Sequence, residues 1–371
     1  MIKEIHLKNF KCFDELKLDR LKTFNVIAGK NNFGKTSILD ALFAFYGVKN
    51  PGILLNIQGF RKEITFLSSD KPFWVDYFKD SNLSSRMSIE IRDETSTIKQ
   101  EYSSGNKSST ESTLSLNVDS ILSNPTPLRQ TLGSSSSENT LNVKVSEVEN
   151  GKRHASTDLF TISITSNGPE ITGQIKQNKK VDAYEFKSAT IITTSKRINK
   201  DTTITNVSTL LTQKRKEELI LNLKKIDSRI NDIAIISVGD AKEIYLDIGF
   251  SEMTEISMLG EGVSRALSFT SLILVQKNAV ILIDEIENGI HYSAIRDIID
   301  ALITASKTNN NQVFVTTHSS DVINAINSLE DKKKDVSYIR LGRDKETSKP
   351  IVSLFDMDDF SYSVENGWEI R

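Results

Sequence analysis

Alternation of apolar and polar residues dominates the start of the chain and predicts short strands. The predicted strands are residues 2–10, 13–18 and 24–28. The short separations suit an antiparallel pair that leads into the third strand. That third strand contains the unbroken apolar run Val26-Ile27-Ala28, which is typical of a strand buried on both faces. A helical pattern follows over residues 36–46, and Gly47 predicts its end.

The middle of the chain returns to a two-residue period. Met87, Ile89 and Ile91 share one face, and similar alternation recurs at 141–145 and 160–164. Two serine-rich stretches, 103–116 and 133–140, contain few apolar side chains, so we expect mobile loops there. We therefore predict a β-rich insertion over residues 85–195. This insertion either binds a partner or only extends a sheet edge without a role of its own, and the sequence pattern favours neither alternative.

The last part of the chain begins with a helical pattern over residues 208–233. Its apolar positions recur at three- and four-residue steps, and they are Leu219, Leu223, Ile226, Ile230 and Ile233. Basic residues occupy the other face, namely Lys214, Arg215, Lys216, Lys224 and Lys225. That face is either solvated or contacts a nucleic-acid backbone. Strands are predicted at 243–250, 279–283 and 312–317.

Composition narrows the class of protein. The 371 residues carry a net charge of −2, so no global positive field indicates nucleic-acid binding. Cys12 is the single cysteine, which excludes an internal disulfide framework and fits a reducing cytoplasm. The sequence contains no stretch of 18 apolar residues, so it predicts no membrane-spanning helix. We expect a cytoplasmic α/β protein with three parts, 1–84, 85–195 and 196–371.

A glycine-rich loop joins the predicted strand 24–28 to the predicted helix 36–46. It reads Gly29, Lys30, Asn31, Asn32, Phe33, Gly34, Lys35 and Thr36, with Ser37 next in the helix. Strand, G-x-x-x-x-G-K-T and helix form the context of a phosphate-binding P-loop, although a chance glycine loop is the alternative. Lys35 would reach the β- and γ-phosphates of a nucleotide, and the Thr36 hydroxyl would ligate Mg²⁺.

Two further strands end in polar residues suited to the same chemistry. Asp284 and Glu285 follow the apolar strand 279–283, and His318 follows the strand 312–317. Carboxyl ends of parallel strands are where open α/β sheets bind ligands. Asp284 would hold Mg²⁺ through a water, and Glu285 would act as the general base on the attacking water. A neutral His318 would hydrogen-bond phosphate or water. The acidic pair alone could instead simply begin a turn.

A second pair of glycines, Gly260 and Gly262, flanks Glu261 at the start of another predicted helix. Backbone N–H groups at a helix N-terminus form an anion site. A nucleotide already held by the P-loop has no use for this site in the same subunit. We therefore expect the pair to serve the nucleotide of another subunit, with a plain helix cap as the alternative.

These motifs together resemble the ABC-type ATPase heads of chromosome-maintenance and recombination-repair proteins. They resemble more closely the stand-alone ATPases of the OLD (overcoming lysogenization defect) group, over residues 1–48 and about 210–371. The resemblance implies a P-loop NTPase head in which a mixed sheet is flanked by helices, with an antiparallel β-lobe. It implies ATP and Mg²⁺ as cofactors and a homodimer that closes around ATP. Gly260–Val263 would be the signature loop, and Asn288–His291 would be the loop that follows the acidic strand.

Two features depart from the family pattern. The signature loop reads Gly260-Glu261-Gly262-Val263 instead of Ser-Gly-Gly-Gln, which implies slow or partner-dependent turnover. The family's glutamine loop has two candidates here, Gln58 and Gln100.

The expected function is an ATP-hydrolysing switch that regulates a separate effector. Residues 319–371 are too few for a nuclease domain of ordinary size, so we expect a nuclease or toxin on another polypeptide. Stand-alone heads of this kind resemble ATPase subunits of anti-phage defence systems. The alternative is an ATPase that repairs or clamps DNA. A transporter motor fits less well, because the regular signature is missing.

Overall fold

The computed structural model describes residues 1–61, 72–106, 139–149, 152–154, 156–167, 170–177, 185–193, 198, 200–239, 241–344, 346–347 and 349–366. The chain forms two compact units. Unit 1 contains Met1–Arg20, Asn32–Ala189 and Arg343–Val352, and unit 2 contains Leu21–Asn31, Thr190–Gly342 and Ser353–Arg371. No helix in the described ranges is long and apolar enough to cross a membrane.

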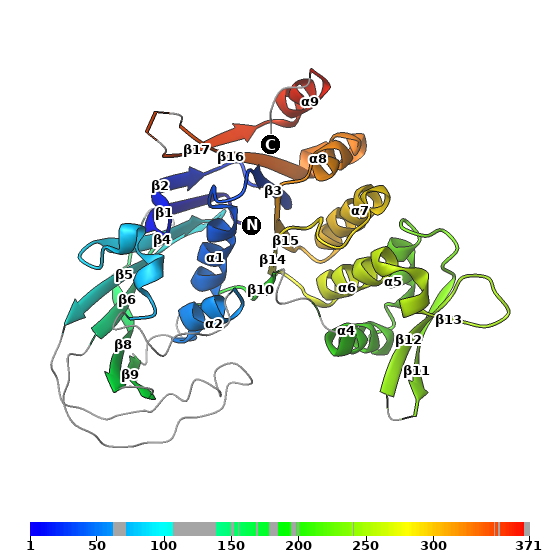
Figure 1. Cartoon of the computed structure of the whole chain (residues 1–371), viewed down its shortest axis with the longest axis horizontal. Coiled ribbons are helices and arrows are strands. Elements are labelled where there is room, and N and C mark those ends of the chain that lie inside the picture. Colours follow the sequence, from blue (N-terminus) through cyan, green and yellow to red (C-terminus); the bar gives the residue numbers. More distant parts are fainter. Residues whose placement is uncertain are drawn as a thin grey trace. The chain divides into compact units, whose positions relative to one another are not determined.

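Unit 1 is built on an antiparallel sheet with the strand order β2-β1-β4-β5-β6-β8-β9, and β7 pairs with β6 (Figure 1). The strands are β1 (Glu4–Phe10), β2 (Phe13–Leu18), β4 (Arg86–Arg92), β5 (Ser96–Asn106), β6 (Asn139–Glu149), β7 (Lys152–Arg153), β8 (Thr157–Asn167) and β9 (Glu170–Gln177). Leu7 pairs with Leu16 on one side and with Ile89 on the other. Paired apolar residues therefore share one buried face, and the first two predicted strands are confirmed.

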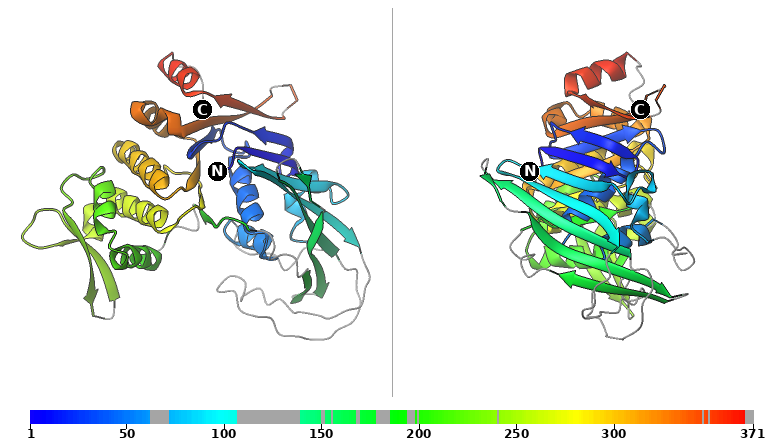
Figure 2. Two further views of the ribbon diagram at one scale, coloured as in Figure 1. Left: turned by 180° about the vertical axis from the view of Figure 1, so that it is seen from behind. Right: turned by 90° about the vertical axis from the view of Figure 1, so that its left-hand side faces the viewer.

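Most of the predicted insertion continues this sheet, whereas its last strand, β10 (Ala189–Ile192), belongs to the second sheet. Strands β4 to β9 extend the sheet onward from β1, and β4, β5, β6 and β8 run side by side in Figure 2. Residues 107–138, which hold most of the two serine-rich stretches, lie outside the described residues. The division of the chain at residues 84 and 195 stays a prediction. Unit 1 also contains α1 (Lys35–Tyr46), α2 (Ile53–Gly59), η2 (Val75–Tyr77) and η3 (Lys79–Ser81).

Unit 2 contains most of a second sheet, with the order β10-β14-β15-β3-β16-β17. The strands are β10 (Ala189–Ile192), β14 (Val280–Ile283), β15 (Gln312–Thr317), β3 (Phe24–Gly29), β16 (Val336–Arg343) and β17 (Pro350–Phe355). Strands β14, β15, β3 and β16 run parallel. Every residue of β14, β15 and β3 is buried, as expected for central parallel strands. The predicted mixed α/β architecture is confirmed.

Helices α6 (Glu261–Val275), α7 (Tyr292–Thr308) and α8 (Ser320–Asn327) lie in succession along this sheet (Figure 1). Unit 2 also contains η5 (Ile256–Leu259), η6 (Glu330–Asp335) and α9 (Met357–Glu365). A small antiparallel sheet is formed by β11 (Asp232–Val238), β12 (Ala241–Asp247) and β13 (Thr254–Glu255). Apolar side chains of these helices and strands bury one another in a single core.

The predicted helix over residues 208–233 is wrong. Two helices, α4 (Lys200–Thr212) and α5 (Lys216–Leu223), occupy the region, and Lys214 between them has a φ of 59°. Ile230 lies beyond α5 and Ile233 lies in β11, yet both are buried in the core. The helix α5 and the strand β11 bury apolar side chains in the same core. The three- and four-residue spacing of apolar residues therefore continued past the end of the helix.

Three of the five basic residues in this region are engaged within unit 2. Arg215 Nε donates to Glu218 at 2.7 Å, and its Nη1 donates to the Leu274 carbonyl at 2.7 Å. Lys216 pairs with Asp232 at 2.5 Å. Lys225 also has a carboxylate partner, Asp300 of α7, at 2.7 Å. The region is therefore not a row of free cations of the kind that a nucleic-acid backbone would attract.

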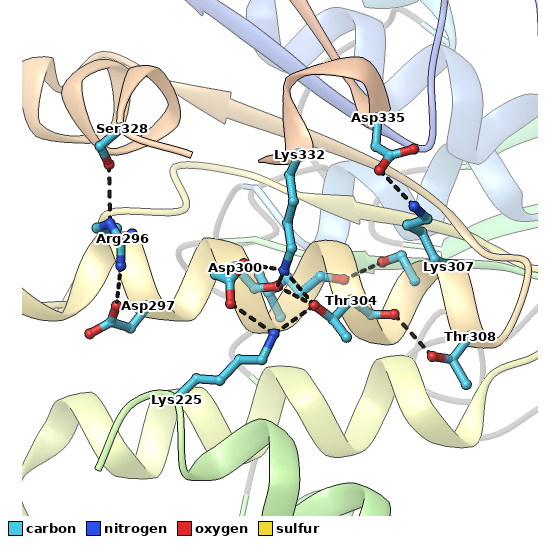
Figure 3. A network of polar contacts seen from close by, with 12 residues as sticks. Lys225, Arg296, Asp297, Asp300, Thr304, Lys307, Thr308, Ser328, Lys332 and Asp335 are labelled. Carbon is cyan, nitrogen blue, oxygen red and sulfur yellow. Dashed lines mark hydrogen bonds and ion pairs between the residues drawn. The ribbon is translucent and has the colours of Figure 1, made fainter. Parts of the chain in front are cut away.

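Asp300 is the centre of a polar network on α7 (Figure 3). Its carboxylate accepts from Lys225, which follows α5, and from Lys332 of η6. The Thr304 hydroxyl accepts from the same two ammonium groups at 2.7 and 2.6 Å. Burial alone would raise the pKa of Asp300, but the hydrogen bonds from the two lysines lower it below its ordinary value. The network joins three segments that are far apart in sequence.

We expect Asp300→Asn to lower the free energy of unfolding by about 1–3 kcal/mol at neutral pH, because two lysines then face each other without a carboxylate. A lowered pKa in the folded state contributes stability above the unfolded pKa, and this stability is lost as pH falls through the folded pKa. The deficit of the variant should therefore shrink below about pH 4. Urea unfolding at several pH values measures this deficit, and Asp297→Asn, at a neighbouring and partly exposed carboxylate of α7, is the control. Equal stability of wild type and Asp300→Asn at neutral pH would contradict this account.

Candidate nucleotide-binding site

The backbone of the glycine-rich loop has the geometry of an anion nest. Asn32 has a φ of 65° and Gly34 a φ of 90°, whereas Asn31 and Phe33 have negative φ values. This alternation turns successive N–H groups toward one side, which is how a P-loop concentrates donors on phosphate. Lys35 begins α1, and Thr36 and Ser37 follow in its first turn. Gly29 to Asn31 belong to unit 2, and residues from Asn32 onward belong to unit 1.

Cys12 and Phe13, at the turn between β1 and β2, leave no room for a side chain at Gly34. A Cβ atom at Gly34 would lie 2.6 Å from Cys12 Sγ and 2.6 Å from Phe13 Cζ. Cys12 Sγ also lies 4.0 Å from Ser37 Oγ, and burial raises the pKa of the Cys12 thiol. The loop therefore rests directly on the β1–β2 turn, and only glycine provides both the positive φ and the space.

Asp40 anchors α1 and was not identified from the sequence. Its side chain is fully buried and pairs with Lys11 of the β1–β2 turn and with Arg61, whose Nη2 is 2.7 Å away. Lys11 also lies over the Tyr77 ring, 4.9 Å from its centroid. The sequence did contain a signal for this role, because Asp40 is a carboxylate on the apolar face of a predicted helix. A charge that is buried in this way needs a partner of opposite charge.

Asp284 and Glu285 follow β14 and are organised by one hydroxyl of β15. Thr316 Oγ1 donates to Asp284 Oδ1 at 2.6 Å and accepts from the Glu285 N–H at 2.8 Å. Glu285 has a φ of 51°, a conformation that is unfavourable for glutamate. The Thr316 hydroxyl thus holds Asp284 in place and fixes the turn that aims the Glu285 side chain.

His318 follows β15 and lies beside the acidic motif. His318 Nδ1 is 3.9 Å from Glu285 Oε1 and 3.1 Å from Glu287 Oε1. Glu287 also accepts from the His318 backbone N–H at 2.8 Å. Its other oxygen, Oε2, is buried with no hydrogen-bond partner among the described residues. Glu287 thus orients the imidazole, a role that the sequence pattern did not reveal.

The edge of the unit 2 sheet brings these groups into one row. Thr317 pairs with Ala28 and Ile283 with Val315, so β14, β15 and β3 end within three residues of one another along the sheet. The acidic motif, His318 and the first residues of the glycine-rich loop therefore lie at adjacent carboxyl ends, as predicted. A buried, hydrogen-bonded carboxylate at Asp284 is a hard oxygen donor of the kind that Mg²⁺ prefers.

The signature loop starts α6. Gly260 caps the helix with a φ of 91°, and Glu261 and Gly262 form its first turn. A Cβ at Gly289, in the loop after the acidic strand, would lie 2.8 Å from Glu261 Oε1. His291 caps α7, where its Nδ1 lies 2.9 Å from Ser293 Oγ. The signature loop and the loop after the acidic strand therefore pack against each other within unit 2.

The two glutamine-loop candidates are both buried. Gln100 donates to the Phe45 carbonyl at 2.8 Å and accepts from the Tyr102 hydroxyl at 2.8 Å. Gln58 donates to the Phe73 carbonyl at 2.6 Å. Gln100 uses both ends of its amide inside unit 1, so it is a core residue in this structure.

Comparison with known proteins supports a nucleotide site. Residues 1–323 match the family described as AAA ATPase domain. A Helicobacter pylori protein named ATP/GTP phosphatase is 28% identical over 365 residues, covering 91% of this chain and 90% of that protein. A 73-residue segment is 38% identical to the DNA double-strand break repair Rad50 ATPase of Archaeoglobus fulgidus, covering 18% of this chain and 8% of that protein. The SMC head domain from Thermotoga maritima is similar with a TM-score of 0.44 and 13% identity, over 95% of this chain and 98% of that one.

Proposed function

This chain belongs to the AAA ATPase domain family and is an ATPase, and on that premise we propose that it has an ABC-type head that works as an ATP-driven dimerisation switch. Two copies would close around ATP, with the signature loop of each over the nucleotide held by the P-loop of the other. Hydrolysis would reopen the dimer.

The observation that carries this proposal is an apolar, exposed surface beside the signature loop. Met258 is 76% exposed and precedes Gly260 by two residues, and Tyr292 is 67% exposed and follows His291 directly. Glycines 262 and 289 pack closely on α7 and α6 respectively, which brings the two loops together. Exposed apolar side chains around backbone anion donors fit a surface that a partner covers. A second copy is the natural partner, because its nucleotide supplies the anion.

The groups of the acidic edge have distinct roles in the proposed reaction. Glu285 would accept a proton from the attacking water, and its strained backbone aims the carboxylate. His318, oriented by Glu287, would hydrogen-bond the transferring phosphate. Asp284 and Thr36 would hold Mg²⁺, which neutralises charge on the phosphates. Lys35 and the N–H groups of residues 29–34 would bind the phosphates themselves.

The output of the switch is proposed to be a separate effector protein, a nuclease or a toxin. The motifs resemble those of the OLD group, and heads of that kind suggest a role in anti-phage defence. The irregular signature Gly260-Glu261-Gly262-Val263 supports slow turnover until a partner binds.

The second candidate is an ATPase that acts on DNA, favoured by the short match to the Rad50 ATPase. The pairing of Arg215, Lys216 and Lys225 with neighbouring groups argues against the basic region as its DNA surface. A several-fold, salt-sensitive stimulation of the ATPase by duplex DNA would select this candidate.

Introducing a charge at Met258 tests the switch. We expect Met258→Glu to remain monomeric with MgATP, because a buried, unpaired carboxylate opposes association, while its affinity for MgADP stays as in wild type. Leu221→Glu is the matched control, since Leu221 is a 66% exposed apolar residue on α5. Sedimentation velocity with and without MgATP measures both variants. ATP-dependent dimers of Met258→Glu, or their loss in Leu221→Glu, would contradict the proposed interface.

A further inference from the structure

Arg343, at the end of β16, contacts the tip of the glycine-rich loop although 311 residues separate it from Asn32 in sequence. Its Nη2 donates to the Asn32 carbonyl at 2.9 Å. Its guanidinium carbon lies over the Phe33 ring, 5.6 Å from the centroid. Both contacts fall within unit 1 and on adjacent residues of the loop.

The hydrogen bond to Asn32 fixes a peptide plane that matters for anion binding. In a planar trans peptide the carbonyl and the next N–H point in opposite directions. Holding the Asn32 carbonyl toward Arg343 therefore turns the Phe33 N–H to the other side. Asn32 has a φ of 65°, which costs energy in a free chain, so the bond also stabilises the nest before any nucleotide arrives.

Residues that follow Arg343 make contacts of their own. Asp344 Oδ1 accepts from the backbone N–H groups of Glu346 and Thr347, at 3.0 and 2.7 Å. Lys349 lies 3.7 Å from Asp14 of β2. Contacts of Asp344 and of Lys349 therefore support the chain that follows Arg343.

We propose that Arg343 is a positioning residue that sets nucleotide affinity by holding the Asn32–Phe33 peptide in its anion-binding orientation. The guanidinium group combines a planar stacking surface with a directed donor, and lysine provides only the charge. The inference rests on the assignment of residues 29–36 as the P-loop. It does not depend on dimerisation or on the effector.

The test compares binding with turnover. We expect Arg343→Ala to weaken MgADP binding about tenfold in calorimetry and to raise the KM for ATP similarly, with kcat and Tm close to wild type. Arg343→Lys should recover part of the affinity, because it keeps the charge but cannot stack. In the Phe33→Leu background the loss caused by Arg343→Ala should be smaller, because the two side chains act together. Arg92→Ala, an exposed arginine of unit 1 that pairs with Glu4 at 2.8 Å, is the control.

Each outcome has a separate meaning. Wild-type affinity in Arg343→Ala would overturn the role of Arg343 while leaving the P-loop intact. A wild-type protein that binds no MgADP would overturn the P-loop assignment itself. A loss in Arg343→Ala that Arg92→Ala reproduces would indicate a general effect of removing positive charge and would also reject the inference.

Discussion

Glu285→Gln should give a folded protein that binds ATP, hydrolyses it at least about a hundredfold more slowly than wild type and accumulates as a dimer. Glutamine keeps the size of the side chain and leaves the backbone hydrogen bond from the Glu285 N–H to Thr316 unchanged. It removes the carboxylate that accepts the proton of water. Phosphate release and sedimentation with MgATP measure the two effects together.

Glu330→Gln is the control for this variant, because Glu330 is a 76% exposed glutamate on η6. It should have wild-type turnover and wild-type sedimentation. A slow Glu285→Gln variant that stays monomeric at saturating ATP would keep Glu285 as the base but reject the dimer switch. Near-normal turnover would remove Glu285 from the chemistry.

Lys35→Ala should bind MgATP about 10–100-fold more weakly, the loss expected when one charged hydrogen bond to phosphate is removed. Lys35 is 6% exposed and begins α1 directly after Gly34, so its side chain is buried next to the loop. Calorimetry with MgATP measures the loss. Thermal unfolding shows whether the fold is retained.

The exposed Lys49, which follows α1, provides the matched Lys49→Ala control. Its nucleotide affinity should be that of wild type. Equal affinity of Lys35→Ala and wild type would show that residues 29–36 are not the nucleotide site. If Lys35→Ala does not fold, Lys35→Met replaces it in the test, because methionine keeps a long apolar side chain and removes only the charged end.

The nucleotide motifs were readable from the sequence because each is local. A P-loop needs one strand, one turn and one helix in succession, and the acidic pair needs one buried strand that ends in carboxylates. Strands β14, β15 and β3 were predicted from unbroken apolar runs, which few other elements produce. The helix predicted over 208–233 failed where the same apolar spacing crossed from α5 into β11.

Contacts between distant segments were not readable. Glu287 is recognisable as the partner of His318 only once β14 and β15 are neighbours. Asp40 forms ion pairs with Lys11 and Arg61, and Arg343 donates a hydrogen bond to Asn32. No local sequence pattern connects these parts of the chain. These residues position the functional groups, and positioning is a property of packing.

The sequence by itself therefore determined the class of chemistry, because the residue types that bind phosphate and activate water must stand in fixed local order. Only the tertiary structure decided which side chains hold those groups in place. The physical reason is that a hydrogen bond or an ion pair depends on distance in space, and pairing of strands brings together residues that the chain separates by hundreds of positions.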